Sequence, residues 1–528
     1  TSEGLYKCVK ANFIAINVTS FFSFTTMDKI GKNSPFLFFV CLAILVLYAY
    51  NPFNLYFLAD DFLHVPESVK SLWVQQNSLR PVGNISLHID YLIGSTNALG
   101  YHITNLLLHI LNTMLIFAVS HEMFKLVLEK EHKILALLVA VLFFSYPFHS
   151  EAVFWVIGRS ASLGALFFLA ACYCWLKQQQ ATMYSIGIFV FFEFALLSYE
   201  SSWVFPVIVL MLIALQWKNI KTTKKQYWLL FACVVLQFII HLVVRFVATK
   251  EFMNLYDAQS FVQLNYPLLV HNFMRLFVRT LVPPFFNYQY LIITFDILIS
   301  TLLLLVFLLY KKKKLTTFFF FFSVAWLISY LPYLSIGIDT HGVEGERYLY
   351  LPSMFFCIWL VYVLQQVFQL KKTVLIIGVC CCMGIVFLFQ ARSYYVKSGK
   401  ITQQTVQAMQ QLTGKEKIFF SNLPQYNKGA VVFRTGLEDA AKWLCNIDEQ
   451  RIIIVSKNNS DEVPKQHHTS SFTTSYQVIN DVKTIDTILV KDATFRKNYI
   501  VKAVAPITFN IATNAWFIYS DTALTIIR

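Results

Sequence analysis

The stretch HITNLLLHILNTMLIFAVS, residues His102–Ser120, decides the fold class because it is predominantly apolar and contains no Asp, Glu, Lys or Arg. A membrane-spanning helix needs about 17–25 consecutive apolar residues, so the stretch predicts one. The rest of the chain has the same character. Of its 528 residues, 57% are hydrophobic and the mean hydropathy is +0.57, whereas soluble domains are about 45–50% apolar.

Further apolar runs before and after this stretch predict further membrane helices. A transmembrane β-barrel is excluded, because barrel strands alternate polar and apolar residues. The fold class predicted is a polytopic α-helical membrane protein with about eleven transmembrane helices. The predicted spans are Pro35–Tyr50, His102–Ser120, Ile134–Tyr146, Ala161–Leu176, Tyr184–Leu197, Trp203–Trp217, Tyr227–Val247, Tyr290–Tyr310, Phe318–Leu334, Leu349–Phe368 and Val374–Gln390.

The lysines orient these spans. Alternate short loops carry Lys125, Lys130 and Lys133, then Lys177, then Lys218, Lys221, Lys224 and Lys225, then Lys311–Lys314, then Lys371 and Lys372. Because basic residues concentrate in cytoplasmic loops, we predict a multi-pass protein of the inner (cytoplasmic) membrane. The opposite loops, and everything after Gln390, would then be extracytoplasmic. The apolar but basic stretch Tyr266–Leu281 predicts an interfacial or re-entrant helix on that outer side.

Three parts of the chain are expected. Residues 1–34 form an N-terminal cytoplasmic segment, in which Met27 is typical of a natural start. Residues 35–390 form the transmembrane domain. Residues 391–528 form a small extracytoplasmic α/β domain, in which Lys400–Leu412 and GLEDAAKWL are expected as helices. Its expected strands are short apolar runs separated by polar turns, namely KIFFSN, RIIIVS, DTILVKD and AWFIYS.

Neither the net charge nor the cysteines indicate a nucleic-acid-binding or metal-binding function. The net charge is +14, but the loop lysines explain it without nucleic acid. Most of the ten cysteines lie in apolar segments, where they act as small hydrophobic residues, and none has metal-type spacing with histidines.

Charged residues at the outer ends of the spans are candidates for function, because burying charge in lipid is costly. Asp60 and Asp61 are adjacent between apolar flanks in the first outer loop. Partial desolvation and a like-charged neighbour would raise the pKa of one of them, which suits a general base. The other candidates are His149, Glu151 and Arg159, then Glu200, then Glu346 and Arg347. The guanidinium of Arg347 suits bidentate contact with phosphate oxygens. Solvated helix ends and snorkelling arginines are the alternatives.

Several of these segments resemble, in the same order, segments of the GT-C glycosyltransferases. They are RPVGNISLHIDYLIGSTNALGYHITNLLLHILNTMLIF (Arg80–Phe117), FHSEAVFWVIGRSASLGALFFL (Phe148–Leu169), ALLSYES (Ala195–Ser201) and ERYLYLPS (Glu346–Ser353). The resemblance is closest to bacterial relatives of the transmembrane-and-TPR O-mannosyltransferases and covers roughly residues 57–368.

The resemblance implies a membrane glycosyltransferase with a polyprenyl-phosphate-linked sugar donor and an extracytoplasmic active site. It implies that Asp60 is the base, that Asp61 tunes it or binds the sugar, and that Arg347 holds the donor phosphate. Glu151, Arg159 and His149 would shape the donor pocket. The acceptor would be a hydroxyl of a protein or of an envelope glycan or lipid, and a single attack would invert the anomeric centre.

The chain departs from the family at two places. The family reads SKE where this chain has Ser198-Tyr199-Glu200, so a phosphate contact there loses its lysine. No TPR array follows the spans. A divalent metal bridging carboxylate and phosphate stays open. So do two other functions, a lipid-linked glycan transporter and a non-catalytic membrane scaffold.

Overall fold

The computed structural model describes most of the chain after residue 42. Residues 43–49 are helical, and the compact unit considered below starts at Ala49. The predicted segment 1–34 and most of the span Pro35–Tyr50 lie outside the described residues. The described residues are 43–75, 78–128, 132–217, 224–250, 266–284, 289–421, 423–454, 457–458, 470–472, 482–492, 497–510, 513–519 and 524–527.

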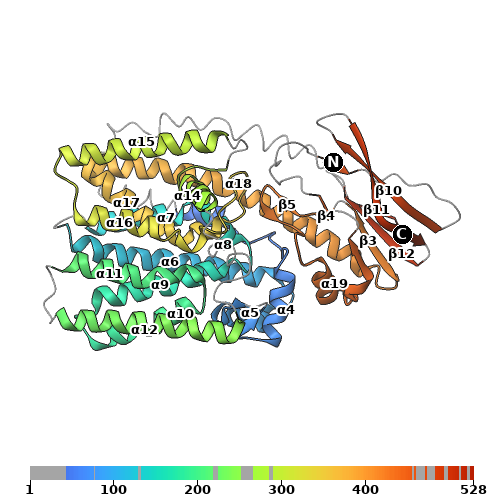
Figure 1. Cartoon of the computed structure of the whole chain (residues 1–528), viewed down its shortest axis with the longest axis horizontal. Helices are drawn as coiled ribbons and strands as arrows, with labels where there is room; N and C mark the ends of the chain where they lie inside the picture. The colour runs from blue at the N-terminus through green and yellow to red at the C-terminus, as the bar shows by residue number, and fades with distance from the viewer. Residues whose placement is uncertain are drawn as a thin grey trace. The chain divides into compact units, whose positions relative to one another are not determined.

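Helices make up the greater part of this unit, and one overlaps every predicted span from His102–Ser120 onward (Figure 1). Two helices precede the first of these spans, α4 (Asp61–Lys70) and α5 (Pro81–Gly94). The others are α6 (Ala98–Lys125), α7 (His132–Phe144), α8 (Ser150–Phe154), α9 (Arg159–Lys177), α10 (Thr182–Leu196), α11 (Phe205–Gln216), α12 (Lys224–Thr249), α14 (Tyr266–Leu281), α15 (Gln289–Lys311), α16 (Thr317–Ile328), α17 (Tyr350–Val367) and α18 (Leu370–Gln410).

Fewer than eleven of these helices are long and apolar enough to cross a membrane alone. Among the described residues six qualify, or seven if α7 and the segment Pro147–Phe154, bent by 58°, form one broken span. α10, α11 and α16 are apolar but shorter. The 13 residues of α7 extend only about 20 Å at 1.5 Å per residue, against about 30 Å of hydrocarbon. The chain is thus a multi-span membrane protein, and the count of eleven is not confirmed.

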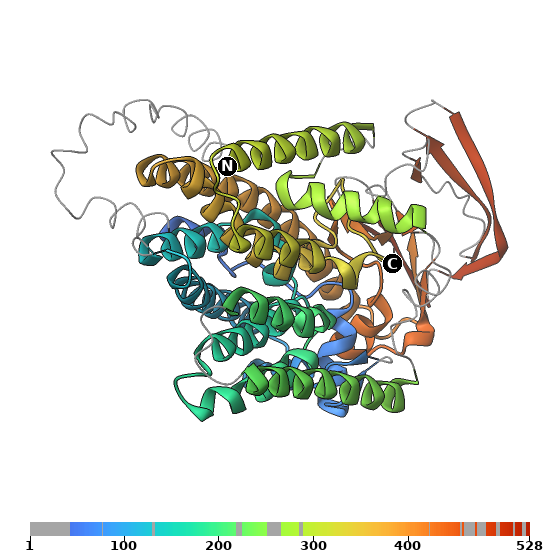
Figure 2. The ribbon, with the colours of Figure 1, turned by 60° about the vertical axis from the view of Figure 1, so that its left-hand side comes forward.

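The bundle has a buried centre and an exposed periphery. The span that contains α17 is 83% buried, whereas the span of α15 is 6% buried although its hydropathy is higher. A helix that is apolar on all sides and exposed in the protein is suited to face lipid. α15 contacts the more polar α14, and Figure 2 shows the two helices side by side.

The last membrane helix continues into the C-terminal region without a break. The predicted span Val374–Gln390 and the predicted helix Lys400–Leu412 form one helix of 41 residues, α18, which passes straight through the expected boundary at residue 390. A continuous helix ties the residues that follow rigidly to the bundle.

Two sheets of three or more strands follow α18 in the described part of the chain. The first has the strand order β13-β12-β3-β7; β12 and β7 run parallel to β3, and β13 is antiparallel to β12. The second, β11-β10-β9, holds the predicted strand DTILVKD. The elements are β3 (Lys417–Ser421), β5 (Tyr426–Asn427), β6 (Ala430–Val431), α19 (Leu437–Cys445), β7 (Ile452–Ile454), β9 (Ser470–Phe472), β10 (Val482–Asp492), β11 (Lys497–Asn510), β12 (Asn514–Tyr519) and β13 (Leu524–Ile527).

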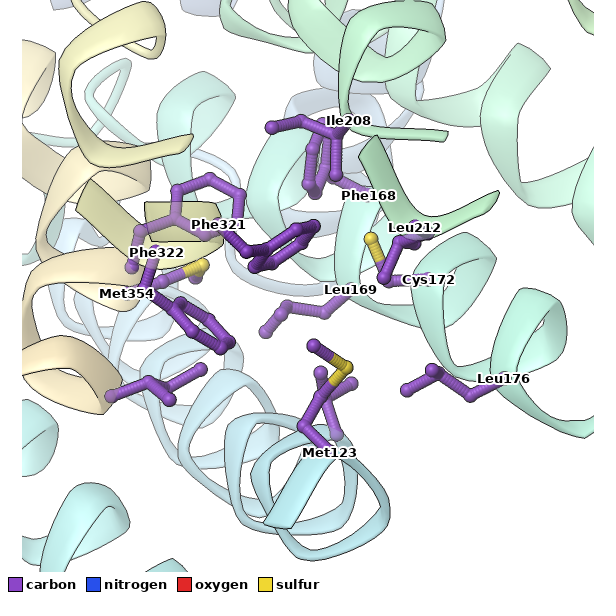
Figure 3. Close-up of a pocket in the computed structure, with 13 residues that line it drawn as sticks. Met123, Phe168, Leu169, Cys172, Leu176, Ile208, Leu212, Phe321, Phe322 and Met354 are labelled. Atoms are coloured by element: carbon purple, nitrogen blue, oxygen red, sulfur yellow. The ribbon is translucent and has the colours of Figure 1, made fainter. Parts of the chain in front are cut away.

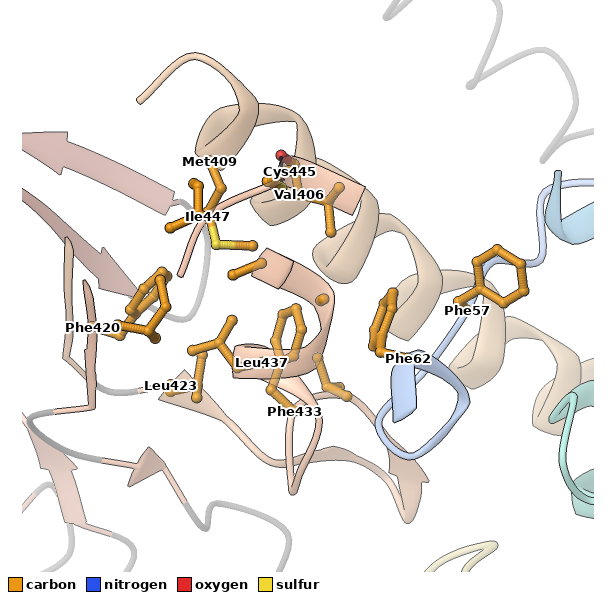
Figure 4. Close-up of a cluster of buried hydrophobic side chains, with 14 of the residues drawn as sticks. Phe57, Phe62, Val406, Met409, Phe420, Leu423, Phe433, Leu437, Cys445 and Ile447 are labelled. Carbon is orange, nitrogen blue, oxygen red and sulfur yellow. Dashed lines mark hydrogen bonds between the residues drawn. The ribbon is translucent and has the colours of Figure 1, made fainter. Parts of the chain in front are cut away.

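One hydrophobic core joins the C-terminal region to the loop before α4 and to the first turn of α4 (Figure 4). Phe57 and Phe62 lie in one buried cluster with Val406 of α18, with Phe433 of the segment before α19, and with Leu437 of α19. Burying each such side chain stabilises the fold by about 1.5–3 kcal/mol. The shared core therefore fixes the segment around residues 425–437 against the loop that carries Asp60 and Asp61.

Candidate functional site

The two adjacent carboxylates occupy different environments. Asp61 opens α4 and its side chain is fully buried. Its Oδ2 accepts a hydrogen bond from the Leu58 amide at 2.9 Å, and its Oδ1 accepts one from the Ile157 amide at 3.0 Å. Asp60 is the N-cap residue of α4, but its side chain makes no capping bond and is 21% exposed. Asp61 therefore ties the loop to the turn before α9, and Asp60 is the carboxylate that a substrate could reach.

Burial raises the pKa of the Asp61 carboxyl to about 8, although the two amide hydrogen bonds act in the opposite direction. Asp60 also raises it, as a like-charged neighbour, by a smaller amount. The raised pKa expected for one member of the pair thus belongs to Asp61. Because Asp61 is enclosed, its carboxylate cannot reach an acceptor hydroxyl. The raised pKa therefore does not make Asp61 the general base.

Asp60 is held from the C-terminal region. Arg434 Nη2 lies 3.2 Å from Asp60 Oδ2, and the Thr435 hydroxyl donates to Asp60 Oδ1. The other arm of the guanidinium, Nη1, lies 2.7 Å from Glu344 Oε1, which also accepts from the Tyr426 hydroxyl at 3.3 Å. Burial raises the pKa of Glu344 against the lowering effect of Arg434. A hydroxyl donating to the Asp60 carboxylate is the geometry that a general base needs toward an acceptor hydroxyl.

Arg347 and Glu151, which come from two different motifs, lie together. Glu151 accepts from the Arg347 amide at 3.0 Å and forms an ion pair with its guanidinium. The guanidinium also lies over the rings of Trp155, at 5.2 Å, and of Tyr348, at 4.6 Å. Its side chain is 19% exposed. Glu151 thus orients an arginine that stays accessible.

Glu200 and Tyr199 bring a further arginine to this region. Glu200 pairs with Arg80 at 2.7 Å and with Arg245 at 3.0 Å. The Arg80 guanidinium lies 4.7 Å from the centre of the Tyr199 ring, and Arg347 is close enough to Tyr199 to interact with it electrostatically. The tyrosine that replaces the family lysine therefore stands between two accessible arginines, and Arg347 is close enough to Arg80 and to Glu344 to interact electrostatically with both. We call Asp60, Glu344, Arg347, Arg80 and Arg434 the rim cluster.

Two other ion pairs, which we call the enclosed pairs, are shut off from solvent. Arg159 Nη1 lies 2.5 Å from Asp90 Oδ2, and the Arg159 guanidinium also donates to the Tyr101 carbonyl at 2.9 Å. Arg279 Nη2 lies 2.6 Å from Glu346 Oε1, and the Ser150 hydroxyl donates to the other oxygen of Glu346. The bonds that Arg159 and Glu346 make here are to the protein itself.

His149 is also buried. Its Nε2 is hydrogen-bonded to the Ser353 hydroxyl at 2.7 Å, and its ring packs against Phe143 and Tyr350. No three His, Cys, Asp or Glu side chains among the described residues are close enough to hold a metal ion. A metal bridging carboxylate and phosphate thus finds no ready-made ligand set there.

The best-formed pocket in the described part of the chain lies elsewhere. Its lining is entirely hydrophobic and includes Met123, Phe168, Cys172, Phe321 and Met354 (Figure 3). It lies among α6, α9, α11, α16 and α17, and contains none of the candidate residues. None of its lining side chains is charged or carries a hydroxyl, amide or imidazole group.

Three residues of the rim cluster were missed from the sequence. Arg80 stands inside a quoted motif, directly before the helix-initiating Pro81, and its position at a helix start was a usable signal. Glu344 and Arg434 carried none. Arg434 meets Asp60 across 374 residues of chain, and such a contact has no local pattern.

Comparison with known proteins bears on this site. The chain is 32% identical over 110 residues to "Protein O-mannosyl-transferase tmtc2" of Xenopus laevis, a match of 21% of this chain and 12% of that protein. It is 30% identical over 112 residues to "Protein O-mannosyl-transferase TMTC3" of Homo sapiens, 21% and 11% of the two lengths. It is 35% identical over 99 residues to "Protein O-mannosyl-transferase Tmtc1" of Drosophila melanogaster, 19% and 10%. The resemblance to this family of transferases is confirmed, over about a fifth of the chain.

Two further comparisons complete the picture. The chain covers only about a tenth of the length of these curated relatives, and no protein-family model matches it. Among solved structures, ArnT from Cupriavidus metallidurans bound to undecaprenyl phosphate has a TM-score of 0.45 and 10% identity, covering 81% of this chain and 86% of that one.

Proposed function

We propose that the protein is a membrane glycosyltransferase that moves a sugar from a polyprenyl-phosphate donor to the hydroxyl of a protein or of an envelope glycan or lipid. The observation that carries the proposal is the rim cluster, in which an accessible carboxylate already accepts a hydrogen bond from a hydroxyl, with accessible arginines nearby. The names of the relatives support a transferase, and the resemblance supports the class of donor.

The chemistry assigns one role to each end of the cluster. Asp60 takes the proton of the acceptor hydroxyl, and the oxygen of that hydroxyl forms a bond to the anomeric carbon. The bond from that carbon to the phosphate oxygen breaks, and its electron pair leaves with the polyprenyl phosphate. Arg347 and Arg80 stabilise the charge that develops on the phosphate. Attack from the face opposite the leaving group inverts the anomeric centre.

The remaining candidates have supporting roles in this proposal. Glu151 and Glu200 orient Arg347 and Arg80, because each carboxylate is bonded to the guanidinium in question. Asp61 and Arg159 hold the loop and the helix start that carry the cluster. The donor pocket expected around Arg159 and His149 is placed instead at the accessible arginines.

The orientation is also a proposal. The lysine loops would be cytoplasmic and the rim cluster extracytoplasmic, which brings the cluster to the face where the C-terminal region lies. A membrane-impermeant thiol reagent applied to intact cells should label Lys442→Cys in α19 and not Lys371→Cys at the start of α18. The reverse pattern would overturn this orientation.

The experiment that tests the function is transfer by the purified protein in lipid. Polyprenyl-phosphate mannose with a radiolabelled sugar is the donor probe, and membranes from a strain lacking the protein supply acceptors. The proposal predicts labelled product with the wild type and none with Asp60→Asn. Equal labelling by both proteins, or none by either, would contradict it.

A further inference from the structure

The C-terminal region reaches the candidate site through one short segment. Val432 accepts a hydrogen bond from the Ala59 amide at 2.9 Å. Phe433 stacks on Phe62 with ring centres 6.1 Å apart. Gly436 has a φ of +82°, and a Cβ there would lie 2.1 Å from the Ala59 carbonyl oxygen, so only glycine allows this approach. Arg434 and Thr435 lie between these anchors and are held beside Asp60.

The same segment also contacts the loop before Arg347. The Val343 amide donates to the Lys428 carbonyl at 3.1 Å. Gly342 and Gly429 approach so closely that a Cβ on Gly429 would lie 2.3 Å from the Val343 nitrogen. The backbone therefore fixes the C-terminal segment against both loops of the site before any side chain is considered.

We propose that Arg434 is a positioning residue of the transfer site, which makes the C-terminal region part of the catalytic unit; this inference rests on the proposed function. Its guanidinium spans Asp60 and Glu344, at 3.2 and 2.7 Å. A planar fork with two donor arms can fix two carboxylates in one geometry. It thereby sets where the base points relative to the loop that leads into Arg347.

A purely stabilising role explains Arg434 less well. All three side chains of the bridge are partly exposed, and exposed ion pairs contribute about 0–1 kcal/mol. The buried core and the backbone hydrogen bonds already hold the segment. Among these contacts, those of Arg434 and Thr435 orient the Asp60 carboxylate, and it is Arg434 that links this carboxylate to Glu344.

The Thr435 hydroxyl occupies the position on Asp60 that an acceptor hydroxyl would take. This hydroxyl occupies one oxygen of Asp60 and Arg434 occupies the other. A neutral hydroxyl is a weaker partner than a guanidinium, and Thr435 is exposed. An acceptor hydroxyl can therefore replace the Thr435 hydroxyl while Arg434 stays bound and keeps the base in place.

The first test needs no substrate. A water-soluble carbodiimide, which attacks protonated carboxyl groups, is applied to the purified full chain, and modification of Asp60 is followed by peptide mass spectrometry. Arg434→Met should raise the modification rate several-fold, because the guanidinium no longer covers Oδ2. Lys442→Met removes an equal charge from an exposed pair in the same region and should leave the rate unchanged. Equal rates in the two variants would overturn the inference.

The second test separates positioning from donor binding. With polyprenyl-phosphate mannose, Arg434→Met should lower kcat at least about 10-fold, which is less than the roughly 100-fold or more that loss of the base itself would cost. Binding of polyprenyl phosphate and the melting temperature should match Lys442→Met. Arg434→Lys, whose single ammonium cannot span both carboxylates, should recover only part of kcat, and it serves also if Arg434→Met does not fold.

The outcomes distinguish the two claims. If Asp60→Asn is inactive while Arg434→Met and Arg434→Lys turn over like Lys442→Met, the positioning role is wrong and the proposed function stands. If Asp60→Asn keeps its activity, the proposed function itself fails. Loss of polyprenyl phosphate binding in Arg434→Met would place Arg434 on the donor and overturn its assignment to the base.

Discussion

The rim cluster and the enclosed pairs contain the same residue types, but they differ in how far their side chains are exposed to solvent. In the enclosed pairs, Arg159 with Asp90 and Arg279 with Glu346, the partners are almost fully buried and the charges meet further donors or acceptors of the protein. In the rim cluster, Asp60, Arg347 and Arg434 keep a fifth to a third of the side chain accessible. A motif cannot tell the two apart, since Glu346 and Arg347 are neighbours in one motif and fall on opposite sides of this division.

The difference has an energetic basis. Removing one partner from a buried pair leaves an uncompensated charge, which costs about 3–5 kcal/mol. An accessible charge that loses its partner can be solvated by water instead. Substituting an accessible residue therefore weakens the interaction with a ligand more than it lowers stability. Variants of the enclosed pairs should therefore lower stability, and variants of the rim cluster should lower activity.

The largest effect on stability is expected for Arg159→Met. The substitution leaves the Asp90 carboxylate buried without its ion pair, so the free energy of unfolding should fall by about 3–5 kcal/mol. Denaturant titration in detergent measures it, with the exposed Lys442→Met as the control that should not change. If Arg159→Met were as stable as that control, the division between the two regions would break down.

A smaller effect, on the donor, is expected for Arg347→Ala. A charge-assisted hydrogen bond contributes about 1.5–3 kcal/mol, which corresponds to about a 10–150-fold weaker use of the donor at about 1.4 kcal/mol per decade. Arg347→Lys keeps a partner for Glu151 but loses the planar fork, so it should recover donor use only partly.

Rates measured against the concentration of polyprenyl-phosphate mannose test this prediction. Acceptor dependence should stay nearly unchanged in both variants. An Arg347→Ala protein that kept its donor dependence and lost affinity for the acceptor would show that Arg347 faces the other substrate.

The smallest effect concerns the pH dependence of Asp61. Because its folded pKa is raised to about 8 from 3.8, the folded chain holds a proton that the unfolded chain releases above about pH 4. Stability should therefore fall as pH rises, by about 1 kcal/mol per pH unit between about pH 5 and 7, relative to Asp61→Asn. Melting curves of both proteins at several pH values measure it. A difference between the two proteins that stays constant from about pH 5 to 7 would mean that the two amides keep Asp61 ionised.

The sequence predicted the apolar helices well because their signal is local. A helix overlaps every predicted span from His102–Ser120 onward, and the strand KIFFSN and the helix GLEDAAKWL were found as expected. The continuity of α18 was missed, because its polar half after Gln390 no longer has the composition of a span. The pairing of Glu151 with Arg347 was not predicted, because the two residues lie in motifs that are far apart in the chain.

The residues alone could not separate Asp60 from Asp61, and only the resemblance implied that Asp60 is the base. Asp61 is enclosed because the Ile157 amide, 96 residues away, binds it, and Asp60 is bridged to Glu344 because Arg434 arrives from the C-terminal region. Both facts depend on tertiary contacts, which leave no trace in the spacing of nearby residues. The packing adds the difference in exposure between the two carboxylates.

The most direct test of the account compares Asp60→Asn with Asp61→Asn in one transfer assay and one set of melting curves. Asp60→Asn should lose about 100–10,000-fold in turnover, the range for a general base, with an unchanged melting temperature. Asp61→Asn should keep turnover within about 10-fold of wild type, since at neutral pH it replaces an enclosed group that touches no substrate. Near-wild-type turnover by Asp60→Asn, together with loss of turnover by a folded Asp61→Asn, would contradict the account at its centre.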